Sequence, residues 1–580
     1  MKRSVIFTVI ISVILCGCNV SVNTFEAKPE NKTVLNMKDA VLTEAEYPFY
    51  LFSPDNEGTI KLFFADENKE IPYIGIDTAK DILESVYHEA NRDEGFKITV
   101  SQNGNITTLT RENKHTMSID SDNDVISFDD FDSFFAPSWS NTVIDTLEHY
   151  GIIEYMRIVK ERSYSLCGSP VDLDLGKYGI DIIENDGKCY IPMQTFSDVA
   201  LSLHCYISLL YNGEAVFGGD FAFDEKNNFD PKIYSAKTGN RSSELADFTY
   251  NELCFVMDHF YGLKEQQGDI EDFDKYLSET GQKQNLLSED PAVFTNSLAD
   301  FLLLYLDDLH SYYMKSSYLA GKDFSLTTSR TGNSYQNYML TYKRLLAARD
   351  AQFPEGVPGY EEIDNTAYIT FDQFDSLEEG ADYYKDPPKA DTKDTVGLLL
   401  YSYDQIKRKD SPIENVVFDL SLNGGGDQTT TCFMLSMILG RSSMTVEDDL
   451  TGGFVCEYFE ADLNLDRKFD EKDSLSDYNL YCIISPSTFS CANLAASELK
   501  NTHTTTLLGQ TSGGGTCIVM PFTLADGTLI LISGCRVLSS IKNGSLYNID
   551  RGIEPDIYIA KPSSFYDRKA LTDYINTDLQ

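Results

Sequence analysis

The sequence predicts an α/β protein with a largely parallel sheet in its C-terminal part. Short apolar runs typical of buried strands alternate with helix-spaced stretches after residue 360. Such alternation favours parallel strands joined by right-handed crossovers. The length of 580 residues exceeds one ordinary core and indicates several domains. In chain order we expect a lipoprotein signal peptide (1–17), a tether (18–45), small α+β modules (46–235), a helical bridge or cap (236–350) and a core domain (351–580).

The N-terminus has the pattern of a targeting segment. Lys2 and Arg3 precede an apolar run from Val5 to Leu15, which is too short for a conventional transmembrane helix. The run ends in Leu-Cys-Gly-Cys, which resembles the lipobox of bacterial lipoproteins and implies lipidation of Cys18. The alternative is an ordinary signal peptide with incidental cysteines. We therefore expect a lipoprotein at the outer face of the bacterial cytoplasmic membrane, or in the cell envelope.

Composition excludes some partners. The net charge is −44, with acidic residues spread along the whole chain. Nucleic acids and anionic membrane surfaces require clustered Lys and Arg, so neither is expected as a partner. Ten cysteines beyond the lipobox show no Cys-x-x-Cys pair and no zinc spacing, and most lie in apolar runs, so we expect buried thiols.

Residues 46–235 contain a weak internal repeat. Ile71-Pro72-Tyr73-Ile74 leads into a helix-like stretch at 78–89, and Cys189-Tyr190-Ile191-Pro192 leads into another at 196–203. The plan resembles the small modules at the N-terminus of copper amine oxidases. Nothing in it indicates catalysis, so a spacer or a binding module is expected.

The bridge and the core follow. Helical spacing begins near Ser242, and a second helix from about Pro291 ends in Asp307-Asp308-Leu309-His310-Ser311. Pro354 and Pro358 mark the next boundary. The core elements expected in order are strand 367–371, helix 395–407, strand 416–420, helix 433–439, strand 481–484, helix 493–500 and strand 506–508.

Ser490 lies at the turn between a predicted strand, Leu480 to Ile484, and a predicted helix. A serine there has its hydroxyl at the positive end of the helix dipole, and the free N–H of Cys491 can face the anion formed when the serine attacks a carbonyl. The plain alternative is that Ser490 only caps the helix.

Three further features complete a candidate site. His310 follows an apolar helix in a polar turn, and a neutral imidazole is the usual base for a serine hydroxyl. Gly424 and Gly425 follow a buried strand and can present bare N–H groups. Glu554, fixed by the proline after it, can orient an imidazole. Taken singly, these residues would be a surface histidine, a flexible turn and a surface charge.

In this order the motifs D-D-L-H-S, V-V-F-D-L-S-L-N-G-G-G, S-T-F-S-C-A-N, L-L-G-Q-T-S-G-G-G and R-G-I-E-P-D-I resemble the tail-specific (C-terminal processing) and tricorn-core family of serine peptidases. The resemblance covers roughly 245–580 and implies a crotonase-like α/β fold with a helical cap. The best-known members use a Ser–Lys dyad, but the matching stretch here, 511–516, has no lysine. The branch with His, Ser and Glu, as in tricorn-core and chlamydial protease-like members, fits instead.

That resemblance assigns the roles. Ser490 maps to the nucleophile, His310 to the general base and Glu554 to the orienting acid. The N–H groups of Cys491 and of Gly424 or Gly425 map to the oxyanion hole. A further serine assists the histidine in the tricorn core, but no residue here is assigned to that role. No PDZ signature precedes the core.

One acidic loop has the oxygen spacing of a calcium loop. Its five candidate ligands are Asp462, Asn464, Asp466, Asp470 and Asp473. Arg467 stands where such loops have glycine, and the last position lacks the bidentate Glu. A polar surface loop is the alternative, and no other cofactor or metal is expected.

The sequence thus predicts a membrane-tethered extracellular serine endopeptidase that acts on polypeptides through an acyl-enzyme. Two other functions stay open: a surface binding protein that keeps the fold without turnover, and an esterase with the same triad.

Overall fold

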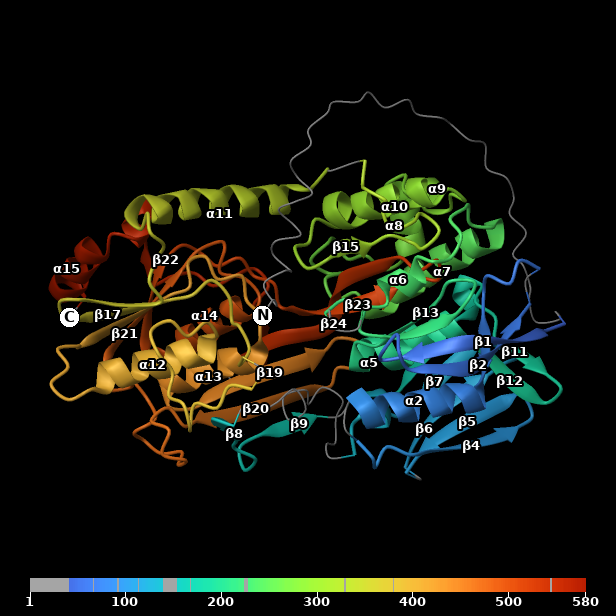
Figure 1. The fold of residues 1–580 in the computed structure, drawn as a ribbon, viewed down its shortest axis with the longest axis horizontal. Helices are drawn as coiled ribbons and strands as arrows, with labels where there is room; N and C mark the ends of the chain where they lie inside the picture. The colour runs from blue at the N-terminus through green and yellow to red at the C-terminus, as the bar shows by residue number, and fades with distance from the viewer. Residues whose placement is uncertain are drawn as a thin grey trace.

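In the computed structural model, the described residues are 41–65, 67–90, 93–112, 114–138, 154–166, 168–223, 228–327, 330–378, 380–542 and 545–579. The predicted signal peptide, Cys18 and most of the tether lie outside them. Figure 1 shows two bodies side by side, one built mainly from the C-terminal core and the other from the N-terminal modules and the bridge.

The core contains the predicted largely parallel sheet. Its strand order is β16-β17-β18-β21-β22-β26. All neighbours pair in parallel except the antiparallel edge pair β16·β17. The strands are β16 (Tyr360–Ile363), β17 (Thr366–Thr370), β18 (Asn415–Asp419), β21 (Asn479–Ile484), β22 (Thr505–Gly509) and β26 (Ile557–Tyr558). The helices are α12 (Thr395–Lys407), α13 (Gln428–Leu439), α14 (Cys491–Thr502) and α15 (Arg568–Asp578). The mixed α/β class is confirmed, whereas the crotonase-like description of the core stays a prediction.

A second, antiparallel sheet joins the core to the bridge. Its main order is β15-β24-β19-β20-β8, with β23 and β25 on β24 and β9 on β20. The strands are β8 (Met156–Ile158), β9 (Tyr164–Leu166), β15 (Tyr312–Lys315), β19 (Ser442–Asp448), β20 (Phe454–Ala461), β23 (Cys517–Thr523), β24 (Leu529–Lys542) and β25 (Ser545–Asn548). Strand β24 pairs with β15 at one end and with β19 at the other, so it runs between the two bodies (Figure 1).

Strands β8 and β9 depart from the expected domain boundary. They belong to the segment assigned to the N-terminal modules, yet both pair with β20 of the core. The exposed edge of β20 provides unpaired backbone groups that these short strands satisfy. The modules and the core therefore share a sheet.

The two copies of the suspected repeat meet in the N-terminal sheet β11-β12-β3-β2-β1-β14-β13. Strands β3 (Tyr73–Gly75) and β12 (Lys188–Pro192) pair antiparallel with Ile74 opposite Ile191. Helix α2 (Ile76–Ala90) follows the first strand, and a helical stretch that includes the π-helix Ser197–Ser202 follows the second. The other strands of this sheet are β1 (Thr43–Leu51), β2 (Glu57–Phe64), β11 (Ile183–Asn185), β13 (Ser208–Tyr211) and β14 (Val216–Gly219).

The N-terminal modules also contain a five-stranded antiparallel sheet, in the order β10-β7-β6-β5-β4. Its strands are β4 (Ile98–Asn103), β5 (Ile106–Arg111), β6 (His115–Asp120), β7 (Val125–Phe128) and β10 (Val171–Asp174). The short helix α3 (Phe131–Phe135) follows β7.

The bridge segment, 236–350, is mainly helical. Helix α6 (Asp230–Ile233) precedes it, and its own helices are α7 (Ser243–Phe260), α8 (Phe273–Glu279), α9 (Lys283–Leu286), α10 (Pro291–Asp300), the π-helix Phe301–Leu306 and α11 (Asn333–Gln352). Asp307, in the left-handed region, ends the π-helix. Its carboxylate accepts the N–H groups of Ser334 and Tyr335 at the start of α11. Helix α11 then leads from the bridge across to the core (Figure 1).

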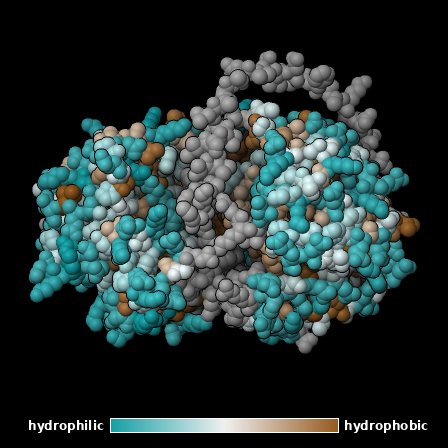
Figure 2. Space-filling view, in the orientation of Figure 1, coloured by the Kyte–Doolittle hydropathy of each residue, from teal (hydrophilic) through white to brown (hydrophobic). Residues whose placement is uncertain are grey.

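The visible surface is mostly hydrophilic, with apolar residues scattered rather than gathered (Figure 2). Across the described ranges, no helix is both long enough and apolar enough to span a bilayer. The nine described cysteines are buried with free thiols, which confirms that they are core residues; Cys167 lies outside the described residues.

Candidate active site

Ser490 occupies a strained position at the start of α14. Its φ of 56° and ψ of −125° are far from the extended values of an ordinary helix cap, and its side chain makes no capping hydrogen bond. A non-glycine residue in such a conformation costs about 1–3 kcal/mol and is held only when its surroundings require it. Simple capping therefore does not explain this serine, whereas a sharp strand-to-helix turn presents a nucleophile.

Backbone hydrogen bonds from two loops fix this turn. Phe489 donates its N–H to the carbonyl of Asn423 at 3.1 Å, and Ser490 donates to the carbonyl of Gly514 at 2.8 Å. The Thr488 hydroxyl donates to the carbonyl of Leu420 at 2.7 Å. The turn is thus held by the loops that follow the neighbouring strands β18 and β22.

His310 lies beside the residue that precedes Ser490. Its ring centroid is 4.7 Å from that of Phe489, in an edge-to-face arrangement. The imidazole donates a hydrogen bond to the backbone carbonyl of Cys517. Within the described residues the structure gives no hydrogen bond from the Ser490 hydroxyl to His310, and the hydroxyl contacts the thiol of Cys491 instead. Catalytic hydrogen bonds are often long in the absence of substrate and tighten when it binds.

The electrostatics around His310 keep its imidazole neutral at neutral pH. Burial lowers its pKa below the ordinary value of 6.5, and this effect exceeds the opposing charges of Asp308 and Asp550. A neutral imidazole is the form that can accept a proton.

The loop of Gly424, Gly425 and Gly426, which we call the glycine loop, lies against Ser490. A Cβ added to Gly425 would lie 2.7 Å from the Cβ of Ser490 and 3.0 Å from the nitrogen of Cys491, and Gly425 has a φ of +102°. Only glycine tolerates both the conformation and the contact. Gly425 therefore keeps the N–H of Cys491 open, and within the described residues the structure gives that N–H no acceptor.

The two glycine donors of the expected oxyanion hole are occupied. Gly424 donates its N–H to the carbonyl of Asp372 at 3.1 Å, and Gly425 donates to the side-chain oxygen of Asn423 at 2.9 Å. Among the three expected donors, only Cys491 is open in this arrangement.

An ion pair supports the glycine loop from helix α11. Arg349 binds Asp372 with two hydrogen bonds of 2.6 and 2.7 Å. Bidentate pairs of this kind fix geometry as well as charge. The bridge thus reaches the loop beside Ser490, a contact that no sequence pattern indicated.

The expected orienting acid does not meet the imidazole. Glu554 is exposed and is not among the groups that act on the pKa of His310. Asp308 and Asp550 are the two acidic residues that do. Asp550 directly precedes the R-G-I-E-P-D-I motif. The orienting role of Glu554 stays a prediction without a contact in support.

Within the described residues the structure gives no hydrogen bond between Ser490 and a lysine. Lys500, the first lysine after Ser490, forms an ion pair with Asp556. The stretch 511–516, where a lysine is absent from the sequence, instead contacts the Ser490 turn through Gly514.

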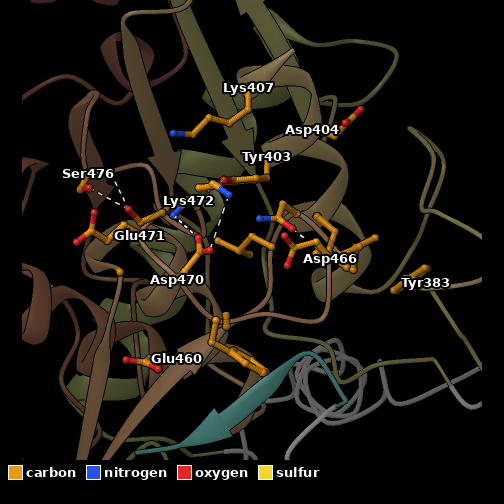
Figure 3. A pocket seen from close by; sticks show the side chains of 18 of the residues that line it. Tyr383, Tyr403, Asp404, Lys407, Glu460, Asp466, Asp470, Glu471, Lys472 and Ser476 are labelled. Atoms are coloured by element: carbon orange, nitrogen blue, oxygen red, sulfur yellow. Dashed lines mark hydrogen bonds and ion pairs between the residues drawn. The ribbon is translucent and has the colours of Figure 1, made fainter. Parts of the chain in front are cut away.

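A cavity of about 1400 Å³ lies over the suspected calcium loop and does not include Ser490 or His310 (Figure 3). The loop's side chains bind the loop itself: Asp462 accepts the N–H groups of Asp466 and Arg467, and Asp473 accepts those of Leu463, Asn464 and Asp470. No group of three or more His, Cys, Asp or Glu suited to a metal is found among the described residues. Calcium binding stays a prediction.

Comparison with known proteins gives one family. Residues 365–559 match the model of peptidase family S41. No curated protein matches the chain.

Solved structures give weak likenesses. The photosystem II D1 C-terminal processing protease is 15% identical with a TM-score of 0.27 over 37% of this chain and 47% of its own, about half its length. A lipoprotein from Streptococcus agalactiae is 15% identical (TM-score 0.35; 59% of this chain, 98% of that one). Mature CPAF is 12% identical with a TM-score of 0.36, and the match covers 58% of this chain and 99% of that one.

Proposed function

We propose that this serine-type peptidase, whose residues 365–559 match the model of peptidase family S41, is an endopeptidase that cleaves polypeptides through an acyl-enzyme on Ser490. The observation that carries the proposal is the strained, non-capping Ser490 at a helix start, with His310 packed against the adjacent Phe489. The absence of lysine from 511–516 supports a histidine base over a lysine base.

The proposed mechanism uses the residues of this site. The Ser490 side chain rotates away from the Cys491 thiol so that its hydroxyl can donate to the imidazole. His310 takes the proton as Oγ attacks the scissile carbonyl, and the N–H of Cys491 stabilises the oxyanion. The imidazolium then protonates the leaving amine, and the acyl-enzyme forms. Water, deprotonated by the same imidazole, cleaves the ester and restores Ser490.

A fluorophosphonate probe tests the proposal, because it labels only an activated serine. Ser490→Ala and His310→Ala should each abolish labelling and lower peptide turnover by about 10⁴ to 10⁶, and the double variant should lose little more, because the residues act as a unit. Lys500→Ala, the matched control, should label normally. Labelling of Ser490→Ala, or near-native turnover by His310→Ala, would refute the proposal.

The same experiment separates the two other functions. A binding protein without turnover would bind peptides yet resist the probe. An esterase would label but cleave only esters when peptide and ester substrates of the same sequence are compared. Cleavage of both, with the peptide bond broken internally, is the expected result.

We also propose that the enzyme is anchored through a lipid on Cys18. The support is the charged start, the short apolar run and the Leu-Cys-Gly-Cys sequence that follows it. Cys18→Ala should release the protein from membranes or leave it unprocessed, as membrane fractionation and the mature mass would report. Cys16→Ala is the control and should leave both unchanged. Unaltered partitioning and mass for Cys18→Ala would exclude the anchor.

A further inference from the structure

We propose that Asp550, and not Glu554, is the acidic residue that holds the segment contacted by His310 and supplies negative charge near its imidazole during catalysis. This inference rests on the proposed function, since it concerns the same Ser490–His310 pair. Its basis is a short segment, 513–517, which we call the glycine strap. Ser490, His310 and Asp550 each contact it.

The strap holds three residues at once. Its Gly514 carbonyl accepts the N–H of Ser490 at 2.8 Å, and its Cys517 carbonyl accepts a hydrogen bond from the imidazole of His310. Between these points, Asp550 Oδ1 accepts the N–H groups of Gly515 and Thr516, each at 3.2 Å. Nucleophile, base and carboxylate are thus fixed to five consecutive residues.

The strap is too tightly packed against Asp550 to shift easily. A Cβ on Gly514 would lie 1.8 Å from the carbonyl oxygen of Asp550, and Gly514 has a φ of +80°. Only glycine permits this approach. Asp550 is also held from its own side, because its N–H donates to the side chain of Asn548 at 2.8 Å.

The carbonyl of Cys517 sets the tautomer. One ring nitrogen of the neutral imidazole carries the proton and must donate it to an acceptor, which here is this carbonyl. The other nitrogen is then the proton acceptor that Ser490 requires. Since a backbone carbonyl already orients the ring, the acid needs only to supply negative charge near it.

Two acids supply charge to the ring, Asp308 more strongly than Asp550, and their contacts distinguish them. The Asp308 carboxylate already accepts five hydrogen bonds. Two come from the backbone N–H groups of His310, at 2.8 Å, and Ser311. Three come from the hydroxyls of Tyr261, Ser311 and Ser533. Asp308 fixes the backbone of the turn. Asp550 uses only Oδ1, and no donor to Oδ2 is found among the described residues.

The isosteric pair Asp550→Asn and Glu554→Gln tests this assignment. Asparagine keeps the Oδ1 acceptor for the strap and removes only the charge. We expect Asp550→Asn to lower kcat about 10²-fold, less than loss of a tautomer-setting aspartate, because Cys517 still orients the ring. The acidic limb of kcat/KM should move to lower pH, since a carboxylate that favours the imidazolium is gone. Glu554→Gln should change kcat less than about twofold and leave the limb in place.

A direct titration keeps the test independent of turnover. In the Ser490→Ala background, the ring proton signal of His310, assigned with His310→Gln, should titrate at lower pH in Asp550→Asn than in the parent, and unchanged in Glu554→Gln. Asp550→Glu should recover part of the lost kcat. A native-like circular dichroism spectrum and melting temperature show that each variant folds.

The outcomes separate this inference from the proposed function. If the wild-type enzyme fails to label at Ser490, the proposed function fails. If it labels through His310 but Glu554→Gln loses activity and Asp550→Asn does not, only the assignment of Asp550 is overturned. If Asp550→Asn does not fold, the Glu554→Gln variant still tests the assignment. A kcat of Glu554→Gln close to that of the wild type supports Asp550 as the acid, and a loss of more than tenfold in that kcat rejects Asp550.

Discussion

The rings of His310 and Phe489 meet edge to face with centroids 4.7 Å apart, which joins the bridge to the turn that carries Ser490. Phe489 also approaches Tyr338 of α11, with ring centroids 6.1 Å apart. One aromatic side chain thus aligns the candidate base from one body with the candidate nucleophile from the other.

Replacing Phe489 should therefore damage catalysis. Phe489→Ala removes the ring that seats His310, and a shift of about 1 Å in a catalytic group can cost on the order of 10² in rate. We expect kcat to fall by about that factor, with Phe489→Leu intermediate. Turnover of a peptide substrate is the measurement, and unchanged kcat in Phe489→Ala would contradict the positioning role.

Gly425→Ala should abolish fluorophosphonate labelling. The added Cβ would lie 2.7 Å from Ser490 Cβ and close the approach to the Cys491 N–H, and loss of one oxyanion donor costs about 10² to 10³ in kcat. Gly356→Ala is the matched control, because its φ of +95° is similar but no atom lies within 4 Å of the added Cβ. Equal labelling of the two variants would reject the steric argument.

The pH profile of the enzyme should reflect the buried imidazole. Burial lowers the pKa of His310 below 6.5, so the neutral, active form persists to lower pH than for an exposed histidine. The acidic limb of kcat/KM should have its midpoint below pH 6.5. A midpoint above 6.5 in steady-state assays would show that another group controls the limb.

The Arg349–Asp372 pair should matter through the glycine loop. Arg349→Met leaves Asp372 without its bidentate partner, and the carbonyl of Asp372 holds the N–H of Gly424. We expect kcat to fall about tenfold. Arg408→Met removes a similar bidentate pair, to Glu362 of edge strand β16, and should leave kcat unchanged. Equal losses in both variants would indicate a general effect on folding.

A buried acid pair between the N-terminal modules and α7 should make stability depend on pH. Burial raises the pKa of Glu252 to about 8, and burial and then the charge of Glu252 raise the pKa of Asp198. Because the folded-state pKa exceeds the usual 4.5, the stability from Glu252 is complete below pH 4.5 and is lost as the pH rises through 8.

Glu252→Gln should therefore flatten this dependence. The melting temperature of the wild type should fall between pH 5 and pH 9 relative to that of the variant, so that the variant is the more stable at pH 9. The exposed Glu355→Gln serves as control and should follow the wild type. Parallel melting curves for wild type and Glu252→Gln across this range would contradict the raised pKa.

Local patterns in the sequence were sufficient for the elements of the core. Helix α12 has the predicted bounds 395–407, and the parallel strands β17, β18, β21 and β22 fall within two residues of their predicted positions. Apolar periodicity encodes such elements directly, because each must bury one face or both. The same apolar periodicity predicted that Ser490 lies directly before a helix.

Contacts between distant segments were decided only by tertiary structure. The resemblance assigned the orienting role to Glu554, in a stretch that also contains Asp550 and Asp556, and no local rule distinguishes the three acids. The choice depends on which side of the turn faces the glycine strap, which the pairing of β23 with β24 and the packing at Gly514 determine. Likewise, the addition of β8 and β9 to β20 depends on a free sheet edge, which exists only once the core has folded.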